Sequence, residues 1–246
     1  MLHKLLHQYH YSPNYRPLAA APTLALPPLS YALACCDPDD PKIRECITEL
    51  LDHPNLDLHL RTPIFELHPL HFAVARHNPA LLSWLALPLS SAGSTALGQT
   101  LLHIASLPLT SESIDQNNPD VVRSIHCART LNPAWLPHPR PSPLHLQPQP
   151  QSRLNSLRPR PRTPLTPAEQ EAQLNTLRVL VDAGIDVRAQ DVDGNTALHY
   201  LVVTLNVGSS AVQLLRDMDA GEEVYHHALN REDLSPRALL ENRSRQ

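Results

Sequence analysis

Short apolar stripes at helical spacing alternate with polar turns along much of the chain. The clearest unit runs from Asp191 to Leu201, where a polar turn leads into the apolar positions of a new helix. Thr196 is predicted to cap this helix with its hydroxyl, and Ala197 occupies the first turn. His199, three residues after the cap, is predicted to hydrogen-bond back to Thr196, while Leu198 points inward.

Similar helix starts recur along the chain, and each is followed by a second amphipathic helix. The residues in the first turn of these starts are Pro28, Pro69, Leu101, Ala197 and Pro236. The second and third starts lie 32 residues apart, a spacing typical of stacked helix–turn–helix repeats. The pattern therefore predicts an all-α solenoid.

The second helices carry their own local signals. In residues 42–51, one helical face carries Ile43, Ile47, Leu50 and Leu51. Asn78 is the expected cap of the helix that opens with Pro79. In the third unit the second helix is displaced by an insertion and resumes at Thr166, which forms a capping box with Glu169. Its expected buried face comprises Leu174, Leu177, Leu180 and Val181, and Gly184 ends it. The second helix of the fourth unit is expected at 211–218.

The repeats divide the chain into four parts. We expect an N-terminal tail or cap at 1–26, repeats 1 to 3 (first part) at 27–106, an insertion at 107–166, and the rest of repeat 3, repeat 4 and a degenerate C-terminal repeat at 167–242. Within the insertion, 119–131 is predicted to form a helix, capped by Asn118 and docked on the stack. Residues 132–165 hold 10 prolines, five arginines and no acidic residue, so a disordered segment with polyproline II character is expected. The net charge of the whole chain is −4, which leaves −9 for the remainder.

The helix starts resemble the ankyrin repeat family, in which they read T-P-L-H-x-A. Matching stretches are Pro69-Leu-His-Phe-Ala73, Thr100-Leu-Leu-His-Ile-Ala105 and Thr196-Ala-Leu-His199. The third repeat together with Ser124–Leu131 is similar to ankyrin-repeat proteins of filamentous fungi. The chain departs from the family pattern at Ser30, Leu201 and Arg237, which stand where histidine, alanine and leucine are expected. These departures indicate degenerate or capping repeats at the ends.

The resemblance implies a module that binds other proteins through a concave surface of loops and first helices. It brings no catalytic residue and no cofactor. The loops 57–62 and 188–195 are therefore the expected contact regions. The candidate contact residues are Asp57, Arg61, Arg188, Gln190, Val192 and Asn195. We expect another protein as partner, and a monomeric chain.

Fifteen histidines raise the question of a metal site. By the family's logic His71, His103 and His199, at the repeat starts, are structural hydrogen-bonding groups. His68 and His71 have ligand-like spacing, but no third ligand is near in sequence, so no metal is expected. The N-terminal histidines are interpreted as surface residues. The chain carries no nucleophile elbow, phosphate loop or H-E-x-x-H motif, so an enzyme is not expected.

Composition favours an intracellular protein, in the cytoplasm or the nucleus. The four cysteines lack C-x-x-C or zinc-finger spacing and are expected to be free thiols. A pI near 6.4 gives no reason to expect nucleic-acid binding. The most apolar segment, 79–89, is too short to span a membrane. Trp84 is expected in the core or between repeats, and Trp135 as an anchor of the insertion.

An alternative function resides in the proline- and arginine-rich segment. Arg158, Pro161 and Pro164 fit an R-x-x-P-x-x-P spacing, which places both prolines on one face of a polyproline II helix, as SH3 domains require. Ser142, Thr163 and Thr166 each precede proline, and phosphorylation there would partly cancel the positive charge. On this hypothesis the repeats only display a docking segment; a solvated linker is the simpler interpretation.

The linker interpretation makes a direct prediction. A peptide spanning residues 152–168 is expected to bind no domain on an SH3 array, because arginine and proline dense enough to match the spacing arise often by chance. A specific complex on the array would instead support the docking hypothesis.

Overall fold

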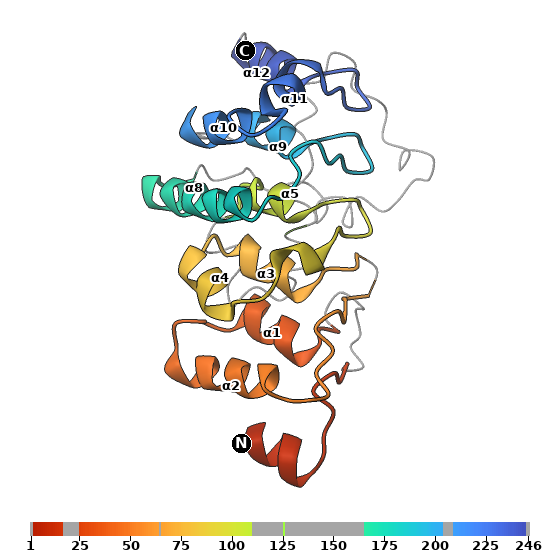
Figure 1. The fold of residues 1–246 in the computed structure, drawn as a ribbon, viewed down its shortest axis with the longest axis vertical. Coiled ribbons are helices and arrows are strands. Elements are labelled where there is room, and N and C mark those ends of the chain that lie inside the picture. Colours follow the sequence, from red (N-terminus) through yellow and green to blue (C-terminus); the bar gives the residue numbers. More distant parts are fainter. Residues whose placement is uncertain are drawn as a thin grey trace, which may run out of the picture.

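The chain forms a stack of helix pairs that runs from the N-terminus at one end to the C-terminus at the other (Figure 1). A computed structural model describes residues 2–16, 25–63, 65–109, 125, 165–203 and 209–244, and these contain helices but no strand. The first helices of the repeats are α1 (Pro28–Cys35), α3 (Pro69–Ala75), α5 (Leu101–Ala105), α9 (Ala197–Val203) and α12 (Pro236–Ser244). The second helices are α2 (Pro41–Leu51), α4 (Pro79–Leu85), α8 (Pro167–Asp182) and α10 (Ser209–Arg216). The fold is an ankyrin-type helix–turn–helix solenoid, as the sequence predicts.

Three shorter elements complete the described chain. A π-helical turn, η1 (Lys4–Gln8), precedes the first repeat, and a 3-10 turn, η3 (Leu89–Ala92), follows α4. Helix α11 (Gly221–His227) lies between α10 and α12 and was not predicted. Its sequence carried a signal, because acidic Glu222 and Glu223 occupy the first turn and His226 and His227 the last, as the helix dipole favours.

Local signals set the helix starts. Asp40 accepts a hydrogen bond from the Lys42 amide at 2.9 Å, and Asn78 accepts one from the Leu81 amide at 3.0 Å. Thr166 and Glu169 form the predicted capping box, with the Thr166 amide 2.9 Å from a Glu169 carboxylate oxygen. A proline in the first turn of α1, α2, α3, α4 and α8 costs no hydrogen bond there, because that amide has no helical acceptor.

The core lies between the two columns of helices and continues from one repeat to the next. Each first helix packs on the first helix of the next repeat, and α8 packs on both α4 and α10. Trp84 is half-buried on α4 beneath the Arg44 guanidinium of α2, whose Cζ lies 5.3 Å from the ring centre. This tryptophan therefore joins two repeats, as expected.

Helix α8 completes the third repeat although it is far from α5 in sequence. Leu177 and Leu180 are fully buried as predicted, whereas Leu174 and Val181 are only partly buried. Gln173 is buried instead, and its amide donates to the carbonyls of Ala105 (2.9 Å) and Leu107 (3.2 Å). The polar side chain thus satisfies carbonyl groups at the end of α5, which the apolar pattern of α8 could not reveal.

Most of the insertion, and with it Trp135, Cys127, Ser142, Thr163 and the Arg158–Pro164 motif, lies outside the described residues. Ile125 is the exception: it is helical, and its side chain is buried in the core of the stack at 1 % exposure. This position falls within the predicted helix 119–131. The remaining residues of that helix, like the predicted domain boundaries, stay predictions.

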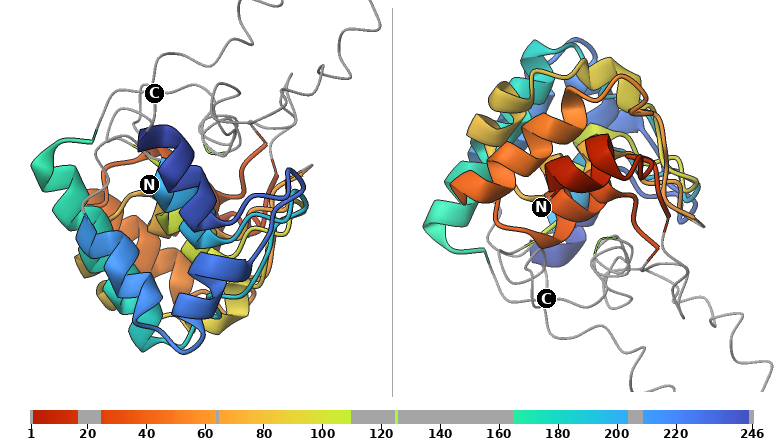
Figure 2. Two further views of the ribbon diagram at one scale, coloured as in Figure 1. Left: turned by 90° about the horizontal axis from the view of Figure 1, so that it is seen from above. Right: turned by 90° about the horizontal axis from the view of Figure 1, so that it is seen from below.

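Four loops project on one side of the stack, and we call them fingers 1 to 4 (Figures 1 and 2). They comprise residues 57–67, 93–99, 186–195 and 228–234. One short polar residue closes the turn of each finger. Its backbone amide donates to a carbonyl four or five residues later in the chain. Its side-chain oxygen accepts from one or two backbone amides of the same finger. These buried capping residues are Thr62, Thr95, Asp191 and Asn230.

Two glycines allow neighbouring fingers to approach closely. Gly98 and Gly194 have positive φ angles, and a Cβ on them would lie 3.1 Å from the Asp191 Cα and 3.0 Å from the Asn230 Cα, respectively. Each of these glycines therefore lies against the capping residue of the next finger. The spacing of the fingers depends on the absence of a side chain at these positions.

Substitution of Gly194 tests this contact against a matched glycine. Gly184 has a similar positive φ of 72°, but a Cβ there would meet nothing within 4 Å. Gly184→Ala is expected to lower the free energy of unfolding by about 1 kcal/mol through backbone strain alone. Gly194→Ala is expected to lose about 1–3 kcal/mol more through overpacking. Urea unfolding measures both, and equal losses would contradict the role given to finger spacing.

Candidate functional site

The finger tips form a hydrogen-bonded ladder along one side of the stack. The Ala96 amide of finger 2 donates to the Phe65 carbonyl of finger 1 at 3.0 Å. The Val192 amide of finger 3 donates to the Leu97 carbonyl at 2.9 Å, and the Arg231 amide of finger 4 donates to the Asp193 carbonyl at 2.9 Å. The four tips are thus linked in series, and the side chains that they carry are held at fixed spacing.

Finger 3 exposes three side chains around a buried one. Arg188, Gln190 and Val192 are exposed, whereas Asp191 between them is buried. Val192 is 40 % exposed, and Leu229 at the start of finger 4 is 52 % exposed, so two apolar side chains face solvent on adjacent fingers. Gln190 bridges the same two fingers through a 3.2 Å hydrogen bond to the Leu229 carbonyl.

Charged groups accompany these apolar side chains. The Arg188 guanidinium lies 3.3 Å from an Asp219 oxygen and 4.0 Å from an Asp186 oxygen. Arg231 pairs with Asp193 at 3.5 Å. All of these side chains are more than 40 % exposed, so the ion pairs contribute little to stability and can exchange for charges on a partner.

Two of the residues expected to contact a partner serve the fold instead. Asn195 is only 4 % exposed, and its side-chain oxygen accepts a 3.0 Å hydrogen bond from Asn230. Arg61 donates to the carbonyls of Glu66, Ala92 and Ser94, which joins finger 1 to η3 and to the start of finger 2. A surface role for Asn195 is therefore wrong, because burial closes it to a partner. The guanidinium of Arg61 is already committed within the chain.

The remaining candidate in finger 1 is Asp57, which is exposed. Its amide donates to the Asn14 side chain at 2.8 Å, and its carboxylate accepts from the His59 amide at 2.9 Å. The N-terminal segment thus reaches finger 1. No local sequence pattern indicates this contact, because 43 residues separate the two partners.

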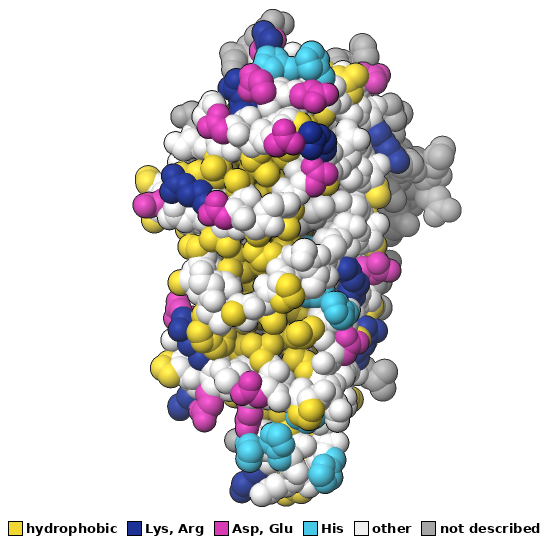
Figure 3. Space-filling model, in the orientation of Figure 1, with side chains coloured by type: hydrophobic (Ala, Val, Ile, Leu, Met, Phe, Trp, Pro, Cys, Tyr) yellow, Lys and Arg dark blue, Asp and Glu magenta, His cyan; other side chains and the backbone are white. Residues whose placement is uncertain are grey.

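The first helices of the middle repeats present no open surface. Every residue of α3, α5 and α9 is buried. The expectation that first helices contribute contact side chains therefore does not hold for these three repeats. On the face shown in Figure 3, partly buried apolar side chains gather over α4, α8 and α10, and histidines lie near both ends of the stack.

The histidines at the repeat starts join consecutive repeats. The Nδ1 atom of His103 accepts from the Thr100 amide at 3.1 Å, and that of His199 accepts from the Thr196 amide at 3.0 Å. The predicted hydrogen bond between Thr196 and His199 is present. The threonine hydroxyl lies 2.9 Å from Nδ1 of the histidine ring, whereas a hydroxyl that caps a helix accepts from a backbone amide. Since Nδ1 accepts a hydrogen bond, it carries no proton, and the proton of the neutral ring is on Nε2.

The Nε2 atoms point to the next finger. His103 donates to the Asn195 carbonyl at 2.9 Å, and His199 donates to the Leu234 carbonyl at 3.0 Å. Burial lowers the pKa of His103 and lowers the pKa of His199 to about 4. Both rings are therefore neutral at pH 7, as this hydrogen-bond pattern requires.

His68 and His71 use the same chemistry at the start of α3. The His68 ring accepts from the Leu70 amide at 3.1 Å, and the His71 ring accepts from the His68 amide at 2.9 Å. Burial lowers the pKa of His68 to about 4 and that of His71 to about 3. Their ligand-like spacing thus reflects a helix cap in which His68 takes the place of threonine.

Two further expectations concern the cysteines, expected to be free, and the membrane, which no segment was expected to span. Cys35, Cys36 and Cys46 are free, and burial raises the pKa of the Cys35 and Cys36 thiols. Within the described residues, no helix combines the length and the apolar character needed to cross a bilayer.

Comparison with known proteins adds one structural similarity. No protein-family model and no curated protein matches the chain. Among solved structures, the ankyrin repeat domain of Bcl-3, a member of the IkappaB protein family, aligns over 88 % of this chain and 97 % of its own, with 17 % identity and a TM-score of 0.25. Since both values are low, the fold assignment rests on the repeat geometry described above.

The neutral histidines predict a pH-dependent stability. Because their pKa values are lower in the folded than in the unfolded chain, stability is complete above pH 6.5 and falls as the pH drops toward 4. Each such histidine adds a slope of about 1.4 kcal/mol per pH unit in this window. Urea unfolding between pH 7.5 and 5.5 is expected to show a smaller slope for His199→Asn than for the parent chain. The exposed His227→Asn is the control, and identical slopes in all three proteins would contradict the prediction.

Proposed function

We propose that the chain is a non-catalytic adaptor that binds another protein through its fingers. The observation that carries this proposal is the row of exposed side chains on a hydrogen-bonded ladder. Arg188, Gln190 and Val192 project from finger 3, and Leu229 lies exposed on finger 4. A partner can bury the two apolar side chains and pair with the surrounding charges, which gives both affinity and specificity.

The fixed geometry of the fingers supports this assignment. Ladder hydrogen bonds hold the tips before any partner arrives, so little conformational entropy is lost there on binding. The buried side chains of α3, α5 and α9 leave the fingers as the accessible part of the surface expected for this fold. We therefore place the centre of the interface on fingers 3 and 4, with Asp57 of finger 1 at its edge.

Affinity capture from cells that express the protein tests the proposal. The parent chain is expected to retain a defined partner, identified by mass spectrometry. Arg188→Glu combined with Val192→Glu is expected to weaken binding of that partner at least tenfold, because it reverses one charge and buries another. Thermal unfolding verifies that the variant remains folded.

A charge reversal away from the fingers controls for the reversal of Arg188. Arg178 is exposed on α8, away from the fingers, and its side chain bonds only locally to Asn175 at 2.9 Å. Arg178→Glu is expected to bind the partner as the parent chain does. Equal binding by the finger variant and this control would overturn the proposed interface.

Deletion of residues 132–165 separates the adaptor from the alternative function. An adaptor that binds through its fingers keeps its partner after the deletion. A protein whose proline- and arginine-rich segment is a docking site for SH3 domains, or is controlled by phosphorylation, loses it. If the finger variant keeps the partner and the deletion variant loses it, the adaptor hypothesis is wrong and the alternative function is supported.

A further inference from the structure

We propose that His3, His7 and Glu49 bind one divalent transition-metal ion, with Zn²⁺ as the natural candidate. The site would join the N-terminal helical segment to α2 of the first repeat. It is independent of the finger surface and of the function proposed for it.

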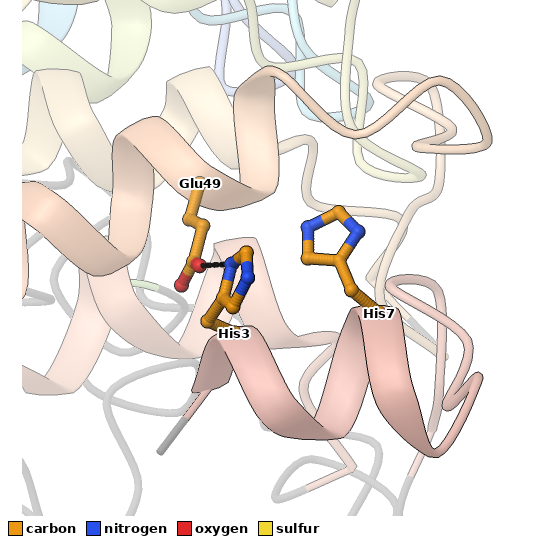
Figure 4. Close-up of side chains that lie close together, drawn as sticks. All are labelled: His3, His7 and Glu49. Carbon is orange, nitrogen blue, oxygen red and sulfur yellow. Dashed lines mark hydrogen bonds and ion pairs between the residues drawn. The ribbon is translucent and has the colours of Figure 1, made fainter.

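The three side chains converge from two elements. His3 and His7 lie four residues apart in the helical segment that contains η1, and their ring centres are 4.5 Å apart. Both rings face α2, which contributes Glu49 (Figure 4). The Nδ1 atom of His3 lies 2.6 Å from a Glu49 carboxylate oxygen, and one ligand atom from each residue lies within 4.8 Å of the others.

The donor set suits zinc. Two imidazole nitrogens and one carboxylate oxygen form a three-ligand set that leaves a fourth position for water. Bond lengths of about 2.0–2.2 Å require the ligand atoms to lie roughly 3.3–3.5 Å apart around a tetrahedral ion. His3 and His7 are exposed and Glu49 is only partly buried, so small side-chain rotations can bring them together.

A metal ion would replace the proton now shared by His3 and Glu49. The hydrogen bond between them already holds one nitrogen and one oxygen ligand side by side. His7 supplies the second nitrogen from the next turn of the helix, the i and i+4 arrangement in which two side chains share one face. The ring centre of His53 lies 5.6 Å from that of His7, but its Nδ1 atom already accepts a hydrogen bond from the Asn55 amide.

The location gives the ion a structural effect. Leu6 is the buried residue of η1, so apolar packing holds this turn to the stack only weakly. A metal ion bound by His3, His7 and Glu49 would fix the N-terminal helical segment to α2 across the end of the first repeat. Zinc binding is therefore expected to raise the melting temperature, because the ion binds the folded chain in preference to the unfolded chain.

Titration of the metal-free full chain with zinc chloride at pH 7.5 tests the proposal. Calorimetry is expected to show one high-affinity ion per chain. His7→Gln and Glu49→Gln are each expected to weaken binding at least tenfold and to abolish the rise in melting temperature. Both positions accept an uncharged side chain of similar size, so the helices remain intact.

Two control variants separate this site from other histidines. His10→Asn changes an exposed histidine of the same segment, and His227→Ala changes one at the far end of the stack. Both are expected to bind zinc as the parent chain does. Equal affinity in all four variants would overturn the assignment.

Cobalt distinguishes the site from one built on the free thiols. Co²⁺ bound by nitrogen and oxygen absorbs in the visible range without the near-ultraviolet band of a cobalt–sulfur bond. We expect this spectrum in the parent chain and its loss in His7→Gln. A sulfur band at the first equivalent of metal would place the ion on one of the four cysteines and would refute the proposal.

Discussion

The hydrogen bond from a buried histidine to the backbone of the following finger holds consecutive repeats in register. In the third repeat, His103 accepts from its own helix start at Nδ1 and donates to the Asn195 carbonyl at Nε2. The same carbonyl accepts from the Asp191 amide and so closes the finger turn. His199 repeats the arrangement with the Leu234 carbonyl. One neutral imidazole therefore couples a helix start, a finger and the next repeat. Protonation would leave the Nε2 donor in place but would remove the acceptor for the amide at the helix start.

This coupling explains why the fingers divide into structural and exposed positions. Asp191 is buried and accepts hydrogen bonds from two amides of its finger and from the Tyr200 hydroxyl. Such a carboxylate is committed to the turn, since its removal would leave buried donors without acceptors. The side chains of Arg188, Gln190 and Val192 are exposed; that of Gln190 also donates to the Leu229 carbonyl of finger 4, and the Val192 backbone amide donates to the Leu97 carbonyl of finger 2. The loop can therefore vary its exposed side chains for a partner without losing the repeat.

The first and last repeats carry other residues where the repeat pattern has histidine or leucine. Ser30 occupies the histidine position of the first repeat; it is fully buried, and within the described residues its hydroxyl has no hydrogen-bond partner. Arg237 of the last repeat is exposed and pairs with Glu241 at 2.8 Å instead of entering a core. Terminal repeats lack one neighbour, so they need other means of closing the solenoid. The proposed metal site lies at the end where Ser30 replaces histidine.

The sequence by itself determined the repeats, because their signals are local. A cap, a proline in the first turn and a histidine three residues after the cap act within one helical turn, so Thr166–Glu169 and Thr196–His199 could be read in advance. The tertiary structure alone decided which side chains of the fingers remain free and which are buried. Asn195 meets Asn230, and Gln173 meets carbonyls of the α5 end, over 35 and 68 residues of chain. Hydrogen-bond partners at such separations follow from stacking, and no local pattern encodes them.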